Sequence, residues 1–197
     1  MIETLAIIGA GPLGRWLALA AAGAGYRVLL EDVMPTNLHH ARESLRGQLG
    51  PAALPHVAFV STIEEAVRDA DLVIDCVPDE LESKLEIFWL LDRMAPPRTV
   101  LATPTTRLSI SDLANCTYRP TQCIAIAAEA SSLAGNDGAS ILLRTTSRTS
   151  PQTVALLDRF WRQLGFVPSF EADPAEHGSG IANGTSLDVA DGAKSAT

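Results

Sequence analysis

The chain has 197 residues and a mass of 20.9 kDa, a size typical of one domain with at most a short appendage. Its 47% hydrophobic and 19% charged residues exclude a chain that is disordered throughout. The formal net charge of -8 argues against nucleic acid or an anionic membrane as a partner. The amino terminus lacks the positive segment of a signal peptide and no apolar run is long enough to span a bilayer, so we expect a cytoplasmic location.

Short runs rich in Val, Ile and Leu alternate with helical patterns, which predicts strand-helix-strand units on a parallel sheet. The predicted strands are residues 5–9, 27–32, 57–61, 72–77, 99–103, 123–127 and 140–144. The predicted helices are residues 13–22, 36–49, 63–69, 80–94, 109–115 and 151–164. Right-handed crossovers between such units give an α/β fold, a Rossmann-type doubly wound and mostly parallel sheet.

The last part of the chain differs in composition from the rest. From residue 172 onward Ala, Gly, Ser, Asp, Asn and Thr dominate, and large apolar residues are rare. Such a segment cannot bury enough surface to offset the entropy lost on ordering. We therefore predict a single domain over residues 1–171 and a flexible low-complexity tail over residues 172–197.

A glycine-rich turn follows the first predicted strand and opens the first helix. In this G-x-G-x-x-G pattern Gly9 makes the tight turn, Gly11 lets the backbone approach a pyrophosphate, and Gly14 permits close packing of helix and sheet. Pro12 and Leu13 lie within the same turn and are also expected to bind the cofactor, and the helix that follows offers phosphate its free N–H groups and positive dipole end. The pattern predicts a dinucleotide site.

The second predicted strand ends in a carboxylate. Asp32 follows Gly14 by 18 residues, near the spacing at which an acid accepts hydrogen bonds from the adenosine ribose. The same carboxylate would repel the 2′-phosphate of NADP. The predicted cofactor is therefore NAD, and a loop that binds nothing is the alternative.

Two further segments carry a family resemblance. Residues 71–80 read DLVIDCVPDE and are followed by Lys84, and residues 101–110 read LATPTTRLSI. Together with the glycine turn they resemble the NAD-binding domain of the L-3-hydroxyacyl-CoA dehydrogenase family over about residues 4–127. The resemblance implies an oxidoreductase of fatty acid metabolism that transfers hydride between NAD and a 3-hydroxyacyl-CoA such as 3-hydroxybutyryl-CoA.

The resemblance also implies site residues at the nicotinamide end of the cofactor. These are Val77, Pro78, Asp79, Lys84, Thr103 and Thr106. Asp79 and Lys84 match the acidic and basic residues that flank the nicotinamide half, and Thr106 matches a serine near the substrate hydroxyl. Two other interpretations stay open, because Asp79 is also a typical acid for a helix amino terminus and can form a solvated pair with Lys84.

The chain departs from the family at the catalytic base. Ala127 occupies the position of the family's histidine, and residues 139–143 contain no acid to orient one. Glu129 is the nearby candidate for a substitute base, with Thr106 as the second candidate catalytic residue. The four histidines are expected at the surface, in caps or in the tail, not in catalysis; they are His39, His40, His56 and His177.

Two functions therefore remain. The first is a dehydrogenase that acts on an acyl-CoA, either as a homodimer or with a separate helical subunit in place of the family's second domain. The second is a non-catalytic NAD(H)-binding sensor or accessory subunit. No metal site is expected, because Cys76, Cys116 and Cys123 form no C-x-x-C pair and are predicted to be free thiols.

Overall fold

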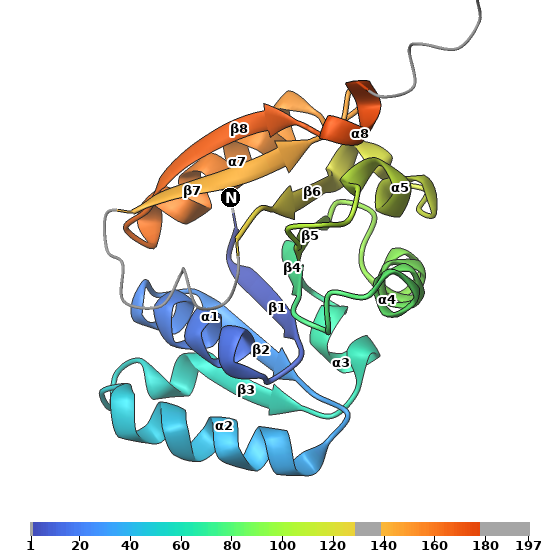
Figure 1. The fold of residues 1–197 in the computed structure, drawn as a ribbon. Helices are drawn as coiled ribbons and strands as arrows, with labels where there is room; N and C mark the ends of the chain where they lie inside the picture. The colour runs from blue at the N-terminus through green and yellow to red at the C-terminus, as the bar shows by residue number, and fades with distance from the viewer. Residues whose placement is uncertain (1, 129–138, 178–197) are drawn as a thin grey trace, which may run out of the picture.

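A computed structural model describes residues 2–128 and 139–177, which form one eight-stranded sheet with helices packed against it (Figure 1). The strands are β1 (Thr4–Ile8), β2 (Arg27–Glu31), β3 (Val57–Val60), β4 (Leu72–Asp75), β5 (Val100–Pro104), β6 (Cys123–Ile126), β7 (Ser140–Thr145) and β8 (Val167–Ala172). The helices are α1 (Pro12–Gly23), α2 (Pro35–Gln48), α3 (Ile63–Val67), α4 (Leu81–Met94), α5 (Ile110–Asn115), α7 (Pro151–Gln163) and α8 (Pro174–His177). Among the helices of these residues, none has the length and apolarity to cross a membrane.

The strand order is β3-β2-β1-β4-β5-β6-β7-β8. β1 pairs in parallel with both β2 and β4, so the direction of winding reverses at β1. β6 and β7 pair antiparallel, and the other neighbouring strands pair in parallel. This order contains the six-strand Rossmann arrangement, in which ligands bind at the carboxyl ends of the strands beside the reversal. The predicted fold class is confirmed.

The sheet separates two apolar cores because successive strand residues point to opposite faces. In β1, Leu5 and Ile7 pack into the core beneath α1 and α7, whereas Ala6 and Ile8 pack into the core shared with α3, α4 and α5. Figure 1 shows α1 and α2 on one side of the sheet and α4 and α5 on the other. All four β1 residues are at most 2% exposed, so β1 is buried on both faces.

The predicted elements all occur, each with ends within two residues of the prediction. β8 and α8 were not predicted. β8 alternates exposed with less exposed residues and contains Pro168, both of which suit a strand at the edge of a sheet. Its neighbour β7 pairs with it over six positions, from Ser140↔Val167 to Thr145↔Ala172.

The predicted start of the tail at residue 172 does not match the structure. Ala172 closes β8, and the next residue, Asp173, is 2% exposed. The Asp173 carboxylate accepts hydrogen bonds from Ser109 Oγ at 2.7 Å and Ser111 N at 2.8 Å, at the amino terminus of α5. The composition predicted a tail because the residues from 172 onward are mostly small and polar. In the structure, hydrogen bonds to the Asp173 carboxylate, and not apolar burial, attach the first of these residues to α5. Residues 178–197 lie outside the described part.

Candidate functional site

The glycine turn connects β1 to α1 at the carboxyl edge of the sheet. Gly9 has φ 105°, a conformation that L side chains rarely adopt, and a Cβ atom there would lie 3.0 Å from Cys76 O. A Cβ on Gly14 would lie 1.9 Å from Gly9 O. A Cβ on Gly11 would have no atom within 4 Å. The fold itself therefore requires glycine at two of the three positions, and the third faces open space.

Two cavities meet at this turn. The first, the β2 cavity, has a volume of about 530 Å³ and lies between the carboxyl ends of β2 and β4. Its lining includes Glu31, Asp32, Val33, Met34, Asn37, Ile63, Pro78 and Ile87. The second, the β5 cavity, has a volume of about 470 Å³ and extends to Leu13, Asp79, Pro104, Thr105, Thr106, Arg107 and Ala128. Both are lined by Gly11, Pro12, Cys76 and Val77, so one elongated ligand can occupy both.

Asp32 ties the glycine turn to the loop after β2. Its Oδ2 accepts a hydrogen bond from Ala10 N at 2.8 Å, and its Oδ1 accepts one from Met34 N at 2.8 Å. The Asn37 side-chain amide lies 3.1 Å from both oxygens. A carboxylate offers about four acceptor positions, so these contacts already use its capacity. A ligand hydroxyl that reaches Asp32 must share or replace the Asn37 amide.

Glu31 lines the same cavity from the other face of β2. Its side chain is buried, with 5% of the residue exposed. Burial, and secondarily the charge of Asp32, raises the pKa of Glu31 to about 7. Sequence reasoning missed this residue, because an acid beside Asp32 at the end of a strand carries no distinguishing pattern.

A buried ion pair supports the turn after β4. Lys84 Nζ of α4 lies 3.2 Å from Asp75 Oδ2 and donates to Val77 O at 3.1 Å. Thr103 Oγ1 donates to the same Asp75 oxygen at 3.1 Å. Lys84, Asp75 and Thr103 are all 0% exposed. In this arrangement α4, β4 and β5 fix the backbone at Cys76 and Val77, which line both cavities.

Lys84 and Thr103 are two of the residues that the resemblance implies at the cofactor. Neither Lys84 nor Thr103 lines either cavity. Both instead donate hydrogen bonds to Asp75 at the end of β4 and so support the turn that follows it. Burial raises the pKa of Asp75 more than the Lys84 ammonium and the hydrogen bond from Val77 lower it. Burial also raises the pKa of the Cys76 thiol, so Cys76 lines the cavities in its neutral form.

The β5 cavity has a polar rim. Thr106 lines it and is exposed, and Asp79 lines it from the turn after β4. Arg107 Nη2 donates to Asp79 O at 2.8 Å, and Arg107 Nε lies 4.0 Å from Asp79 Oδ2. Asp79 Oδ1 is buried with no hydrogen-bond partner in the described residues. Asp79 and Thr106 thus line the same cavity, together with Arg107, which the sequence analysis did not identify.

Ala127, which occupies the position of the family's histidine, lies beside an apolar residue, Leu142. Ala127 N donates a hydrogen bond to Leu142 O at 2.8 Å, so β7 places Leu142 next to Ala127. Neither side chain can accept or transfer a proton. Ala128, not Ala127, lines the β5 cavity. Glu129, the candidate for a substitute base, lies outside the described residues.

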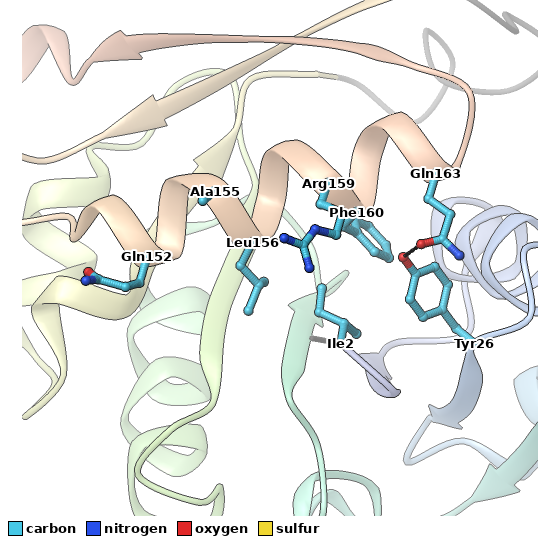
Figure 2. Close-up of a pocket in the computed structure, with 8 residues that line it drawn as sticks. All are labelled: Ile2, Tyr26, Gln152, Ala155, Leu156, Arg159, Phe160 and Gln163. Carbon is cyan, nitrogen blue, oxygen red and sulfur yellow. Dashed lines mark hydrogen bonds between the residues drawn. The ribbon is translucent and has the colours of Figure 1, made fainter.

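Another cavity, of about 320 Å³, lies at the opposite end of the sheet, between α7 and the residues that precede β1 and β2 (Figure 2). Tyr26 Oη donates to Gln163 Oε1 at 2.6 Å across it, and the Tyr26 ring lies 5.4 Å from that of Phe160. These contacts hold α7 against the amino ends of the strands. The cavity is therefore separate from the glycine turn, which lies at the carboxyl ends.

Comparison with known proteins identifies relatives over the same segment. Residues 4–127 match the family described as "3-hydroxyacyl-CoA dehydrogenase, NAD binding domain". A probable 3-hydroxybutyryl-CoA dehydrogenase of Bacillus subtilis is 33% identical over 136 residues, which are 62% of this chain and 47% of that protein. An L-carnitine dehydrogenase of Burkholderia mallei is 33% identical over 196 residues, with 87% of this chain and 58% of that protein covered. The chain spans about half the length of these relatives.

Solved structures agree with this result. The (S)-3-hydroxybutyryl-CoA dehydrogenase of Ralstonia eutropha superposes with a TM-score of 0.79 at 22% identity, over 88% of this chain and 64% of that one, which shows the common fold. An NAD+-dependent 5-formyl-3-hydroxy-2-methylpyridine 4-carboxylic acid 5-dehydrogenase superposes with a TM-score of 0.77 at 28% identity, over 88% and 59%. The chain therefore belongs to the 3-hydroxyacyl-CoA dehydrogenase family, and residues 4–127 are its NAD-binding domain.

Proposed function

We propose that this chain binds NAD(H) across the glycine turn, with the adenosine half in the β2 cavity and the nicotinamide half in the β5 cavity. The observation that carries the proposal is the open space at Gly11, where the two cavities meet and where, its neighbours in the chain apart, no described residue lies within 4 Å of an added Cβ. Gly11 is also the N-cap of α1 and supplies no side chain to cap the helix. The first amides of α1 are thus available to a pyrophosphate.

The residues of each cavity suit the half assigned to it. A ribose hydroxyl that shares or replaces the Asn37 amide can donate to Asp32, and the Asp32 carboxylate disfavours the 2′-phosphate of NADP(H). Thr106 offers a hydroxyl, and Asp79 a carboxylate, at the other end. Bound NAD(H) would supply the hydride acceptor or donor for the family's interconversion of a hydroxyl and a carbonyl group. The nominal substrate is a 3-hydroxyacyl-CoA such as 3-hydroxybutyryl-CoA, the substrate named for the Bacillus relative.

The presence or absence of a group that transfers a proton distinguishes an enzyme from the second candidate function, a non-catalytic NAD(H)-binding protein. A positioned general base contributes about 10²- to 10⁴-fold to such reactions. Ala127 and Leu142 provide no such group, which favours a non-catalytic NAD(H)-binding sensor or accessory subunit. Catalysis by the chain would need a base from elsewhere, such as Glu129, a second copy in a homodimer or a helical subunit.

Titration of the purified chain with NADH, followed by fluorescence, tests cofactor binding. We expect saturable binding that is tighter for NADH than for NADPH. Gly11→Ala should weaken NADH binding by about tenfold or more, because the added methyl group occupies the approach of the pyrophosphate. The matched control is Gly47→Ala on the exposed face of α2, where a Cβ also has open space; it should leave binding unchanged. Tighter binding of NADPH would contradict the role given to Asp32.

Incubation with acetoacetyl-CoA and NADH, followed by absorbance, separates the two functions. Turnover at rates ordinary for a dehydrogenase would exclude the sensor. Tight NADH binding without turnover would exclude an enzyme that acts alone. We expect little rescue from Ala127→His, because the adjacent Leu142 cannot orient an imidazole.

A further inference from the structure

Glu31 lies beneath the β2 cavity on one defined face of the sheet. It is the last residue of β2 and pairs with Ile8 of β1 and Val60 of β3. Those two residues belong to the core shared with α3 and α4, so the Glu31 side chain points to that face and Asp32 points to the other. Helices α3 and α4 contribute Ile63 and Ile87 to the same cavity.

The carboxyl group of Glu31 has no partner within the described part of the protein. No residue there donates a hydrogen bond to it, whereas Asp32 receives bonds on both oxygens. Apart from these two acids, the lining is largely apolar and includes Ile8, Ile63, Val77, Pro78 and Ile87. The Glu31 oxygens are not among the buried atoms that lack a partner, so they are reachable from the cavity that Glu31 lines, where a ligand can supply a hydrogen-bond partner.

We propose that Glu31 is a further recognition residue of the dinucleotide site, and that its carboxyl group hydrogen-bonds to the edge of the adenine base. The proposal rests on the proposed binding of NAD(H). The apolar walls suit the flat faces of a purine. The purine edge carries an amino donor next to ring nitrogen acceptors, and a protonated carboxyl group offers a complementary acceptor and donor.

The protonation state of Glu31 follows from its surroundings. Burial and the charge of Asp32 hold its pKa at about 7, so the neutral form is well populated below neutral pH. Asp32 is the other charged side chain in the lining, and Cys76 lines the cavity as a neutral thiol. The acids that α3 and α4 carry nearby are exposed to solvent; they are Glu64, Glu65, Glu82 and Glu86. Lys84 is buried with Asp75. Glu31 is therefore the group whose ionisation opposes entry of the base near pH 7.

The test is the pH dependence of NADH binding. If only protonated Glu31 pairs with the base, the Kd should be about tenfold higher at pH 8 than at pH 6, because the competent fraction falls from about ten elevenths to one eleventh. Calorimetry at pH 8 in two buffers of different ionisation enthalpy should show uptake of about 0.9 proton per NADH bound. Glu31→Gln keeps a donor and an acceptor without a charge, so its Kd should be independent of pH and its proton uptake near zero.

Glu64→Gln makes the same chemical change on α3 at an exposed side chain and should behave as the unchanged protein. Wild-type binding with no pH dependence between pH 6 and 8, or a pH profile that Glu31→Gln shares, would overturn the role of Glu31 while leaving cofactor binding intact. Absence of NADH binding at every pH would instead overturn the proposed function. A merely structural Glu31 would alter thermal stability without linking a proton to NADH binding.

Discussion

The buried pair of Lys84 and Asp75 permits a quantitative prediction. Lys84→Met keeps the length of the side chain and removes the ammonium group, which now lies 3.2 Å from Asp75 Oδ2 and 3.1 Å from Val77 O. The side chains are 1% and 0% exposed, so water cannot replace the lost charge. Breaking a buried pair costs about 3 to 5 kcal/mol of unfolding free energy. At about 2 to 4 °C per kcal/mol, the Tm should fall by about 6 to 20 °C.

The loss should depend on pH in a defined direction. Burial already raises the pKa of Asp75, and removal of Lys84 raises it further. A carboxyl group whose pKa is higher in the folded than in the unfolded state destabilises the fold above the unfolded pKa, and the penalty fades as pH falls toward about 4. The difference between wild type and Lys84→Met should therefore be large at pH 7.5 and small at pH 4.5.

Urea unfolding at both pH values measures this effect. The double variant Asp75→Asn/Lys84→Met leaves no buried charge and should recover most of the stability lost in Lys84→Met. Arg162→Met, which removes one partner of the exposed pair with Asp158, is the control and should have little effect. The reasoning fails if Lys84→Met loses less than about 1 kcal/mol at pH 7.5, or if the double variant is no more stable than the single one.

Other predictions test the remaining contacts. Gly14→Ala should lower the Tm as well as abolish NADH binding, because its Cβ would lie 1.9 Å from Gly9 O; an unchanged Tm would refute the packing argument. Asp173→Ala should cost about 1 to 2 kcal/mol at pH 7, as for other lost helix caps, when measured by urea unfolding. Burial alone would raise the pKa of Asp173, but hydrogen bonds from Ser111 and Ser109 hold it below its ordinary value. The stability that Asp173 adds is therefore present above pH about 4 and lost as pH falls further, so the variant and wild type should converge in acid. Thiol titration should count three free cysteines in denatured protein, and Cys123, whose pKa burial raises to about 12, should react slowly in the native state.

The local pattern of the sequence was enough to predict the fold and the glycine turn. Alternation of apolar runs with helical periodicity predicted the parallel sheet, and the turn between β1 and α1 is a local feature whose glycine positions follow from backbone sterics. Asp32 was predictable because its distance from Gly14 along the chain is set by one helix and one strand. Ala127 was identified from the sequence because a missing imidazole needs no coordinates to be recognised.

The roles of Lys84, Glu31 and Asp173 were decided only by the tertiary structure. Lys84 supports the turn and does not line the cleft, because α4 places it against Asp75 at the end of β4, whose carboxylate also accepts a hydrogen bond from Thr103 of β5. Glu31 faces the cavity because the register with β1 and β3 fixes its side of the sheet. Period-two alternation shows that neighbouring residues point apart, but not which helix each one meets. Contacts between residues far apart in the chain depend on strand order and register, and these are set by packing of the whole sheet.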